Sequence, residues 1–365
     1  MKKWKKILVV CLIIVGLCMI YSTTFISKSA ETGNLIIKHN LFSDYTYEIY
    51  DDHIKLLQYK ETNAKKVVIP DTMLGKPVTE IGEYCFSIYF CGEKISKFDR
   101  KFETVQMGKN ICTIDKCAFL ECESLKEVLG NIRIEEIKRA GFEGCSNLCM
   151  VEFAMNRVED YAFEGCVSLQ KINTNSELTY IGEDAFSPCR PLTDIGSQKH
   201  LEYIGNKAFR GSGLTEFEAN DDIKFGYAVF QNTPFLNEQF QYINNGVLMK
   251  CIYEGEKNYL VLPEGIISVD LGSVYGDASK IEEIYIPDSV TEIKGYILDE
   301  DNKNVTYYIP SSVVSIGFDY DDGTHMGLNY EAGKIVTTEG AYAQQYAKDH
   351  EIPCEIVDHI EMPEE

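Results

Sequence analysis

Basic residues are scarce in this sequence. Across 365 residues, 35 lysines and arginines stand against 57 aspartates and glutamates, which gives a formal net charge of −22. A chain this acidic repels phosphate backbones, which argues against nucleic-acid binding. Only one long apolar run is present, at residues 7–20, and a composition with 45% hydrophobic and 25% charged residues is ordinary for a globular protein. A multi-span membrane protein and a wholly disordered chain are therefore not expected.

Signatures of catalysis are missing as well. None of the six histidines lies in H-E-x-x-H, and the sequence has no G-x-S-x-G and no phosphate-binding glycine loop. Two acidic stretches, residues 298–304 and 319–325, do not match the calcium loop D-x-[DN]-x-[DN]-G, so polar loops are favoured there while calcium binding stays open. We predict no catalytic, cofactor-binding or metal-ligating residue, and no cofactor.

The first thirty residues have the pattern of a targeting segment. Four lysines in residues 2–6 precede the apolar run 7–20, whose 14 residues suit a secretory signal better than a membrane span, which needs ~20. Ser27 and Ser29 fit the −3 and −1 positions for cleavage after Ser29, with an uncleaved N-terminal anchor as the alternative. Residues 1–30 are therefore predicted to export the chain, leaving it secreted or at the cell surface.

A repeated pattern organises the rest of the chain. Phenylalanines recur at intervals of 33, 23, 21, 23, 23 and 21 residues, at Phe86, Phe119, Phe142, Phe163, Phe186, Phe209 and Phe230. The units read L-x-x-V-x-h, a turn, h-x-x-I-G-x-x-A-F, and a short G-C-x-S-L corner. A unit of about 23 residues cannot bury its own apolar face, whereas stacked units can. The pattern predicts a leucine-rich-repeat solenoid, β-rich with short helical or 3₁₀ turns, in which the phenylalanines form one spine.

Cysteine occupies a fixed position in the repeat. Three residues after the spine phenylalanine come Cys122, Cys145, Cys166 and Cys189, and in later units Ser212 and Thr233. A position that accepts Cys, Ser and Thr indicates a small buried corner whose side chain bonds the backbone of a neighbouring coil. Stacked strands lie ~4.8 Å apart, within disulfide range, so lateral disulfides stay open.

These units resemble the BspA-like bacterial leucine-rich-repeat family. The segments "IGEDAFSPCRPLTDI" and "VEDYAFEGCVSLQKI" are similar to that family's L-x-x-V-x-I-P-x-S-V-x-x-I-G-x-x-A-F-x-G-C-x-S-L, and the resemblance covers about residues 67–356. Its members are mostly surface or secreted proteins, and several are linked to adhesion to host matrix proteins or to other microbes. The resemblance therefore implies an exported adhesion or protein-binding role.

The N-terminal half of the exported part is predicted to be a cap followed by repeats. Residues 31–75 include an alternating pattern typical of a strand pair, which would cover the open first coil as an N-terminal β cap. Leucine-rich repeats follow over residues 76–235. About ten surplus residues come after Phe86 and interrupt the spacing once.

The C-terminal half is less regular. In residues 236–280 the repeat is degenerate, and two apolar stretches around residues 254–257 predict a β-hairpin insertion. The repeats resume over residues 281–330. Residues 331–357 have the pattern of a strand–helix–strand cap, and residues 358–365 are expected to be a frayed tail.

Two columns of side chains on the L-x-x-V-x-h strands are predicted to face solvent and form a protein-binding face. One column is Gln106, Glu152, Asn173, Glu218 and Tyr285, and beside it lie Glu127, Lys171, Asp194, Glu216 and Glu283. Six of the ten are acidic, which favours a basic partner segment. The alternative is that these side chains only keep an exposed sheet soluble.

The sequence thus predicts an exported, non-catalytic interaction protein. Its partners would be extracellular or surface proteins, and it would touch the membrane only through residues 1–30. The alternatives are a structural spacer of the cell envelope and a hydrolase that uses a pair of carboxylates. Neither the ligand nor the oligomeric state can be derived from the pattern.

Overall fold

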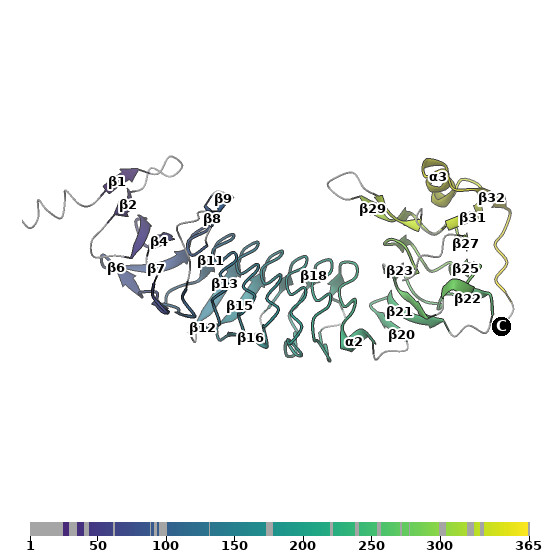
Figure 1. The fold of residues 1–365 in the computed structure, drawn as a ribbon. Coiled ribbons are helices and arrows are strands. Elements are labelled where there is room, and N and C mark those ends of the chain that lie inside the picture. Colours follow the sequence, from purple (N-terminus) through teal and green to yellow (C-terminus); the bar gives the residue numbers. More distant parts are fainter. Residues whose placement is uncertain are drawn as a thin grey trace, which may run out of the picture. The chain divides into compact units, whose positions relative to one another are not determined.

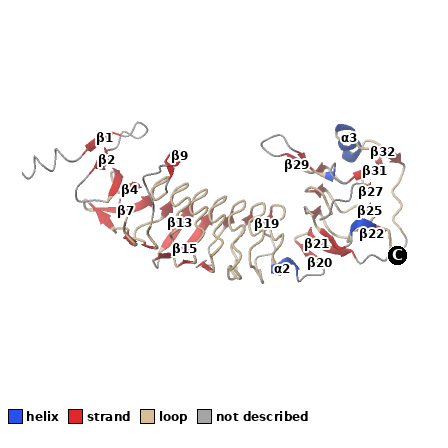
Figure 2. Ribbon diagram, in the orientation of Figure 1, coloured by secondary structure: helices blue, strands red, loops and turns tan. Residues whose placement is uncertain are grey.

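The computed structural model shows a chain made of two units, Met1–Asn220 and Asp221–Glu365, and each unit is described by itself (Figure 1). The structure describes residues 25–28, 35–39, 44–60, 63–87, 89–90, 93–94, 101–130, 132–172, 178–219, 222–237, 241–253, 257–270, 272–276, 278–298, 304–319, 325–328 and 332–363. Within these ranges no helix is both long and apolar enough to cross a membrane. Strands and turns dominate, with few helices (Figure 2).

A parallel sheet runs through the coils of the first unit. Its strands are β7 (Lys76–Ile81), β11 (Thr113–Ile114), β13 (Arg133–Ile137), β15 (Ala154–Val158), β17 (Tyr180–Ile181) and β18 (Tyr203–Ile204). The register aligns one buried apolar residue per strand, namely Ile81, Ile114, Ile137, Val158, Ile181 and Ile204. Since side chains alternate along a strand, the residue before each of these points to the outer face of the sheet.

A second parallel sheet takes one more strand from most of the same coils. It contains β5 (Lys66–Val68), β10 (Thr104–Gln106), β12 (Glu127–Leu129), β14 (Met150–Val151) and β16 (Lys171–Ile172). Its buried column is Val67, Val105, Val128, Val151 and Ile172. Each coil thus crosses both sheets and buries one apolar residue in each, which confirms the predicted leucine-rich-repeat solenoid.

Antiparallel strands precede the first coil. They are β1 (Phe25–Lys28), β2 (Leu35–His39), β3 (Tyr45–Ile49) and β4 (Ile54–Tyr59), of which β4 also pairs in parallel with β7. The expected strand pair is therefore β3–β4, and the Tyr59 ring lies 5.2 Å from that of Phe86. Residues 66–68 belong to the second solenoid sheet instead. The capping role of this segment stays a prediction.

Two small strand pairs branch from the first coils. The strand β6 (Thr72–Met73) turns back on β7, and β8 (Tyr89–Phe90) pairs with β9 (Glu93–Lys94). The second pair lies in the surplus segment after Phe86. The extra residues therefore form an excursion between two coils, and they leave the stacking of the neighbouring units intact.

The corners between the sheets depend on left-handed backbone. Two residues before each spine phenylalanine, φ lies between 46° and 59° at Tyr84, Cys117, Ala140, Tyr161, Asp184 and Lys207. A second left-handed residue follows the phenylalanine in several coils, at Glu121, Gly144, Gly165 and Gly211. These residues close the corner with separate i→i−3 turns, so the helical or 3₁₀ turn expected there is absent from the described residues of this unit.

Close stacking explains the glycine of the I-G pair. A Cβ added to Gly182 would lie 2.4 Å from the backbone nitrogen of Asp160, and one added to Gly205 would lie 2.5 Å from that of Glu183. The backbone of the preceding coil occupies the space that any side chain would need. In these two coils, glycine is therefore required by the distance between coils.

The phenylalanine spine is present as predicted. From Phe86 to Phe209 each ring stacks on the next, with centroids 4.6 to 5.3 Å apart and interplanar angles of 8° or less. All of these side chains are fully buried. Offset stacking adds to the gain from burying the rings, so the spine joins every coil to its neighbours.

The cysteine position also behaves as the sequence predicts. The thiols of Cys122, Cys145, Cys166 and Cys189 donate to the carbonyl oxygen of the spine phenylalanine one coil earlier, at 3.1 to 3.4 Å. All ten cysteines that the structure describes are free thiols. Burial raises the pKa of the Cys145, Cys166 and Cys189 thiols, which keeps them protonated and able to donate.

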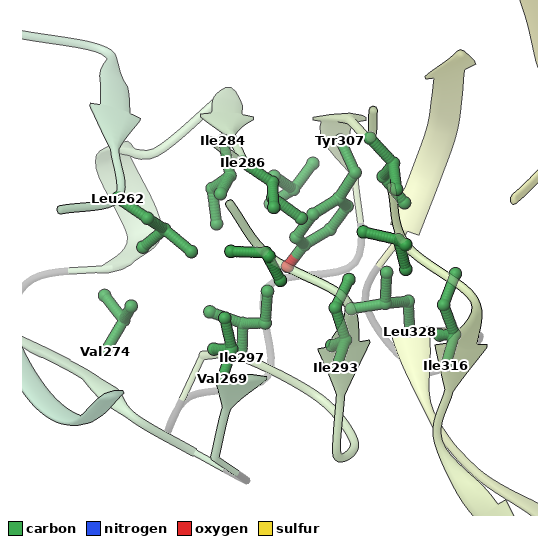
Figure 3. Close-up of a cluster of buried hydrophobic side chains, with 14 of the residues drawn as sticks. Leu262, Val269, Val274, Ile284, Ile286, Ile293, Ile297, Tyr307, Ile316 and Leu328 are labelled. Carbon is green, nitrogen blue, oxygen red and sulfur yellow. The ribbon is translucent and has the colours of Figure 1, made fainter. Parts of the chain in front are cut away.

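The second unit has two sheets of its own. One contains β20 (Gln241–Asn244), β21 (Val247–Tyr253), β23 (Ser268–Val269), β24 (Val274–Gly276), β26 (Glu292–Ile293) and β28 (Ser315–Ile316). The other contains β22 (Tyr259–Val261), β25 (Glu283–Tyr285), β27 (Val305–Tyr308), β31 (Ala332–Thr338) and β32 (Cys354–Val357). Between them lies an apolar core in which Val269, Ile284, Ile293 and Tyr307 point toward one another (Figure 3).

Shorter elements complete this unit. They are β19 (Lys224–Phe225), α2 (Pro234–Asn237), a 3₁₀ turn at Ala278–Lys280, β29 (Phe318–Asp319) paired with β30 (His325–Met326), and α3 (Tyr342–Asp349). The helix α3 lies between β31 and β32 in sequence, as the predicted strand–helix–strand pattern requires. It buries Ala343, Tyr346 and Ala347 in the core of the unit. The role of this segment as a cap stays a prediction.

The predicted hairpin around residues 254–257 is wrong. The strand β21 pairs antiparallel with β20 around Asn245 and Gly246, while β22 pairs with β25 in the other sheet. Asn245 and Gly246 have φ of 47° and 75°, the left-handed pair that a two-residue hairpin needs. The strands β22 and β23 are in register with β25 and β26, so most of residues 258–280 continues the repeat.

The described part of the C-terminal tail lies beside β22. Residues 358–363 form no helix or strand. Met362 and Pro363 nevertheless line a hollow of 530 Å³ together with residues 257–264. These residues therefore lie against the rest of the unit rather than forming the free, frayed end that the sequence suggested.

We predict that Phe163→Ala destabilises the first unit by ~3–5 kcal/mol, because it leaves a cavity between the rings of Phe142 and Phe186. Urea unfolding followed by circular dichroism measures this change. A loss below ~1 kcal/mol would show that the spine does not hold the coils together.

Cys166→Ser should cost far less than Phe163→Ala, because the hydroxyl can donate to the same Phe142 carbonyl and serine occupies this position at residue 212. Thiol titration of the native chain should leave the buried ladder of Cys122, Cys145, Cys166 and Cys189 unreacted until denaturant is added. Rapid reaction of these four thiols in the native state would contradict their placement.

Candidate interaction face

The outer face of the main sheet in the first unit carries one side chain per coil in strict register. We call this row the outer ladder: Lys55, Glu80, Thr113, Glu136, Arg157, Tyr180 and Tyr203. Each ladder residue lies next to a buried apolar residue that anchors it to the core, and each is half-buried. The ladder is thus held on a rigid sheet and remains partly open to solvent.

Ion pairs join the first half of the ladder to the turns beside it. Lys55 Nζ lies 2.6 Å from Asp115 Oδ2 and 3.3 Å from Glu80 Oε2, and Lys138 Nζ lies 3.2 Å from Asp115 Oδ1. Burial acts to raise the pKa of Asp115, but hydrogen bonds from Lys55 and from a backbone N–H outweigh it and lower that pKa. The charges in this half are therefore matched within the molecule.

Arginine and tyrosine form the second half. The guanidinium carbon of Arg157 lies 3.7 Å from the ring centroid of Tyr180, and the Tyr180 and Tyr203 rings stack at 5.2 Å. Arg157 Nε also lies 3.4 Å from Glu136 Oε1 and 3.7 Å from Glu159 Oε1. Tyrosine and arginine are the residue types that contribute most to protein–protein interfaces, and here they lie together on adjacent strands.

Carboxylates crowd the turns next to these tyrosines. We call Glu143, Asp160, Glu164, Glu183 and Asp184 the acidic corner. They come from three successive coils, on the turns that follow the strands of the main sheet. Two of them have a cation nearby: Asp160 Oδ2 lies 3.8 Å from Arg139 Nη1, and Asp184 Oδ1 lies 3.5 Å from Arg210 Nη2.

Mutual repulsion shows in the titration of this corner. Burial, together with the charges of Asp184 and Glu143, raises the pKa of Glu164 to about 7. Burial and neighbouring carboxylates also raise the pKa values of Glu143 and Glu183. The corner therefore holds negative charge that its own arginines do not fully neutralise.

The sequence-predicted face is divided in the structure. Gln106 and Glu127 lie half-buried in β10 and β12, Glu152 is exposed just after β14, and Lys171 is exposed in β16. Two of these side chains bond the backbone of their own sheet, since Gln106 Nε2 donates to Leu129 O and Glu152 Oε2 accepts from Gly130 N. These four residues share the outer face of the second sheet.

The remaining predicted residues do not extend that face. Asp194, Glu216 and Glu218 are exposed, but they lie in extended segments outside any described strand. Asn173 lies outside the described residues. Glu283 and Tyr285 belong to β25 of the second unit, and its sheet is a different one.

The expectation that Tyr285 projects into solvent is wrong. Only 7% of this residue is exposed, because its ring stacks on Tyr308 at 4.1 Å and meets Tyr259 edge-on at 6.1 Å. Both Tyr285 and Tyr308 donate from their hydroxyls to the carboxylate of Glu283. Glu283 thus organises a tyrosine cluster within its own sheet.

The outer ladder was missed by the sequence reasoning, although a signal was present. The tripeptide Tyr-Ile-Gly occurs twice in phase, at residues 180–182 and 203–205. The position before the buried isoleucine points outward in every coil, so two tyrosines there must stack across neighbouring strands. The interpretation of tyrosine as generally abundant concealed this spacing.

The described residues offer no metal site, since no group of three or more His, Cys, Asp or Glu side chains among them could hold an ion. Two hollows occur in the second unit. One, of 500 Å³, is lined by residues of α3 and β32 and by no carboxylate, and the 530 Å³ hollow beside β22 has Glu264 as its only carboxylate.

Fold and repeat together define the chain as a leucine-rich-repeat solenoid. A model of the BspA type leucine rich repeat region matches it in six copies, over residues 52–154, 112–237 and 233–320. The chain therefore belongs to the BspA-type leucine-rich-repeat family of bacterial surface-type proteins, as its resemblance implied. Among curated proteins, none matches the chain.

Solved bacterial structures share the fold. A leucine rich cell surface protein from Faecalibacterium prausnitzii A2-165 is 17% identical with a TM-score of 0.52, and the match covers 84% of this chain and 96% of that one. The leucine rich repeat protein of T. pallidum is 23% identical with a TM-score of 0.46, covering 55% and 92%. A leucine-rich repeat protein from Bacteroides ovatus is 16% identical with a TM-score of 0.42, covering 92% and 98%.

The raised pKa of Glu164 predicts a pH-dependent stability. Because the ordinary value is 4.5 and the folded value is about 7, the unfolded chain ionises first and the folded state loses stability as pH rises through this window. Glu164→Gln should therefore stabilise the unit at pH 8, by ~1 kcal/mol after discounting for solvent screening, and change little at pH 4. Urea unfolding of both proteins at the two pH values measures the difference.

Glu123→Gln is the matched control, because Glu123 is exposed and removing its charge relieves no crowding. A Glu164→Gln effect that is the same at pH 4 and pH 8 would mean that repulsion in the acidic corner does not reach Glu164.

Proposed function

We propose that this chain is an exported, non-catalytic interaction protein that binds extracellular or surface proteins, in an adhesive role, through the second half of its outer ladder. The observation that carries the proposal is the Arg157–Tyr180–Tyr203 stack, half-buried on three adjacent parallel strands. Rigid aromatic and arginine side chains on a sheet lose little entropy on binding, which is the property that interface hot spots share.

Export is supported by the pattern of residues 1–30 and by the relative from F. prausnitzii, which is described as a cell surface protein. The basic start and the 14-residue apolar run suit a secretory signal. Cleavage after Ser29 and retention as an N-terminal anchor both deliver the solenoid to the outside of the cell.

The absence of catalysis is supported by the nature of the described sites. The carboxylates with raised pKa values lie half-exposed in the acidic corner, where water has access to them. The two hollows of the second unit hold no carboxylate pair. A hydrolase of the carboxylate type places both groups in a site that excludes bulk water.

The proposal predicts that Tyr180→Ala with Tyr203→Ala weakens capture of a surface protein by about ten-fold or more, which corresponds to ~1.4 kcal/mol or more. The full chain is immobilised, challenged with host matrix proteins and with bacterial surface extracts, and the affinity for the captured protein is measured by surface plasmon resonance. Circular dichroism confirms that the variant is folded.

Tyr259→Ala with Tyr342→Ala is the matched control, because it removes two tyrosines from the second unit. The control should bind like the wild type. Equal losses in the two double variants, or an unchanged affinity in the Tyr180/Tyr203 variant, would move the binding site away from the outer ladder.

A further inference from the structure

The acidic corner next to the ladder tyrosines contains unmatched charge. Among the residues that the structure describes, Glu143, Glu164 and Glu183 have no lysine, arginine or histidine within ion-pair distance, although each is half-buried. Beside them, Asp184 is 6% exposed, and its Oδ1 accepts no hydrogen bond within the same residues and meets only Arg210, at 3.5 Å. Half-buried carboxylates without a cation are costly, so a cation supplied from outside is favoured there.

The same surface shows how it accommodates a guanidinium group. Arg139 lies over the ring of Tyr161 at 4.6 Å and beside Asp160, while Arg157 lies over Tyr180 at 3.7 Å and beside Glu159. In both cases a planar cation covers a tyrosine face while it pairs with a carboxylate from a neighbouring turn. The chain uses this arrangement twice with its own arginines.

A third pairing of tyrosine and carboxylate has no arginine over it among the described residues. The ring of Tyr203 stacks on Tyr180, and burial raises its pKa together with the nearby charges of Asp160 and Glu183. Tyr203 and Glu183 thus face the same space as the unmatched carboxylates. Aromatic surface and negative charge lie together where a partner's arginine would need both.

We propose that the acidic corner, with Tyr203 at its edge, docks an arginine-rich segment of the partner protein. This inference rests on the proposed function and specifies the chemistry of the partner. Guanidinium groups would pair with Glu164 and Glu183 and stack on the tyrosine ring. An ammonium group supplies the charge without the planar stack, so arginine should be preferred over lysine.

The test uses the full chain and fluorescein-labelled nona-arginine, with nona-lysine as the comparison peptide, by fluorescence anisotropy. We expect nona-arginine to bind at least about three-fold more tightly than nona-lysine, and its binding to weaken by about ten-fold between 50 and 200 mM salt. Binding should also weaken by about three-fold from pH 8 to pH 6, because Glu164, with a pKa of about 7, gains a proton over that range.

Three double variants locate the site. Glu164→Gln with Glu183→Gln should weaken nona-arginine binding by about ten-fold, whereas Glu123→Gln with Asp288→Asn removes two exposed acids elsewhere and should change it by less than about two-fold. Equal losses in these two variants would overturn the proposal. A larger loss in Glu216→Gln with Glu218→Gln would also overturn it, because binding would then lie near the predicted strand face.

Failure here is distinguishable from failure of the proposed function. If nona-arginine does not bind at 50 mM salt while the Tyr180/Tyr203 variant still loses the captured surface protein, the arginine-rich assignment is overturned and the ladder keeps its role. If nona-arginine binds with the expected variant pattern, the assignment is supported whether or not the captured protein is lost in the tyrosine variant.

Discussion

Stacking of one coil on the next is the interaction on which the rest of this structure depends. A single coil of about 23 residues exposes most of its apolar side chains, and only its neighbours remove them from water. In the first unit, the phenylalanine rings stack at 4.6 to 5.3 Å, and the cysteine thiols add a hydrogen bond between successive coils. Left-handed corners allow the backbone to turn sharply enough to repeat this contact in every coil.

The same stacking creates the surface that we assign to binding. Because the buried residues are in register from strand to strand, the residues before them are in register too, at the spacing of neighbouring strands. That spacing suits ring stacking and cation–π contacts, which the ladder uses at Arg157, Tyr180 and Tyr203. It also brings carboxylates of successive turns close enough to repel each other, and the raised pKa of Glu164 reports this crowding.

The repeat could be predicted from the sequence because the fold is periodic. Six buried columns kept in phase leave few alternatives, so the spine phenylalanines, the cysteine corner and the family were all predicted correctly. The hairpin at residues 254–257 was misplaced, because the apolar stretches on either side continue the repeat columns and the Asn245–Gly246 turn signal was overlooked.

The candidate site was harder to predict, for a physical reason. Outward positions carry no hydrophobic period, so whether an outward side chain is accessible depends on its neighbours across the sheet. Tyr285 points outward and is nevertheless covered by Tyr259 and Tyr308. Asp194 and Glu218 continue the sequence column but not the sheet, since the second sheet of the first unit has β16 as its last described strand.

Hydrogen–deuterium exchange of the bound chain tests the central claim most directly, because it compares every face of the solenoid in one experiment. With a captured surface protein bound, we expect new protection in peptides that span residues 157–164, 180–184 and 203–210, where the ladder and the acidic corner lie. Protection confined to residues 104–106, 127–129 and 150–152, or to the second unit, would contradict the assignment.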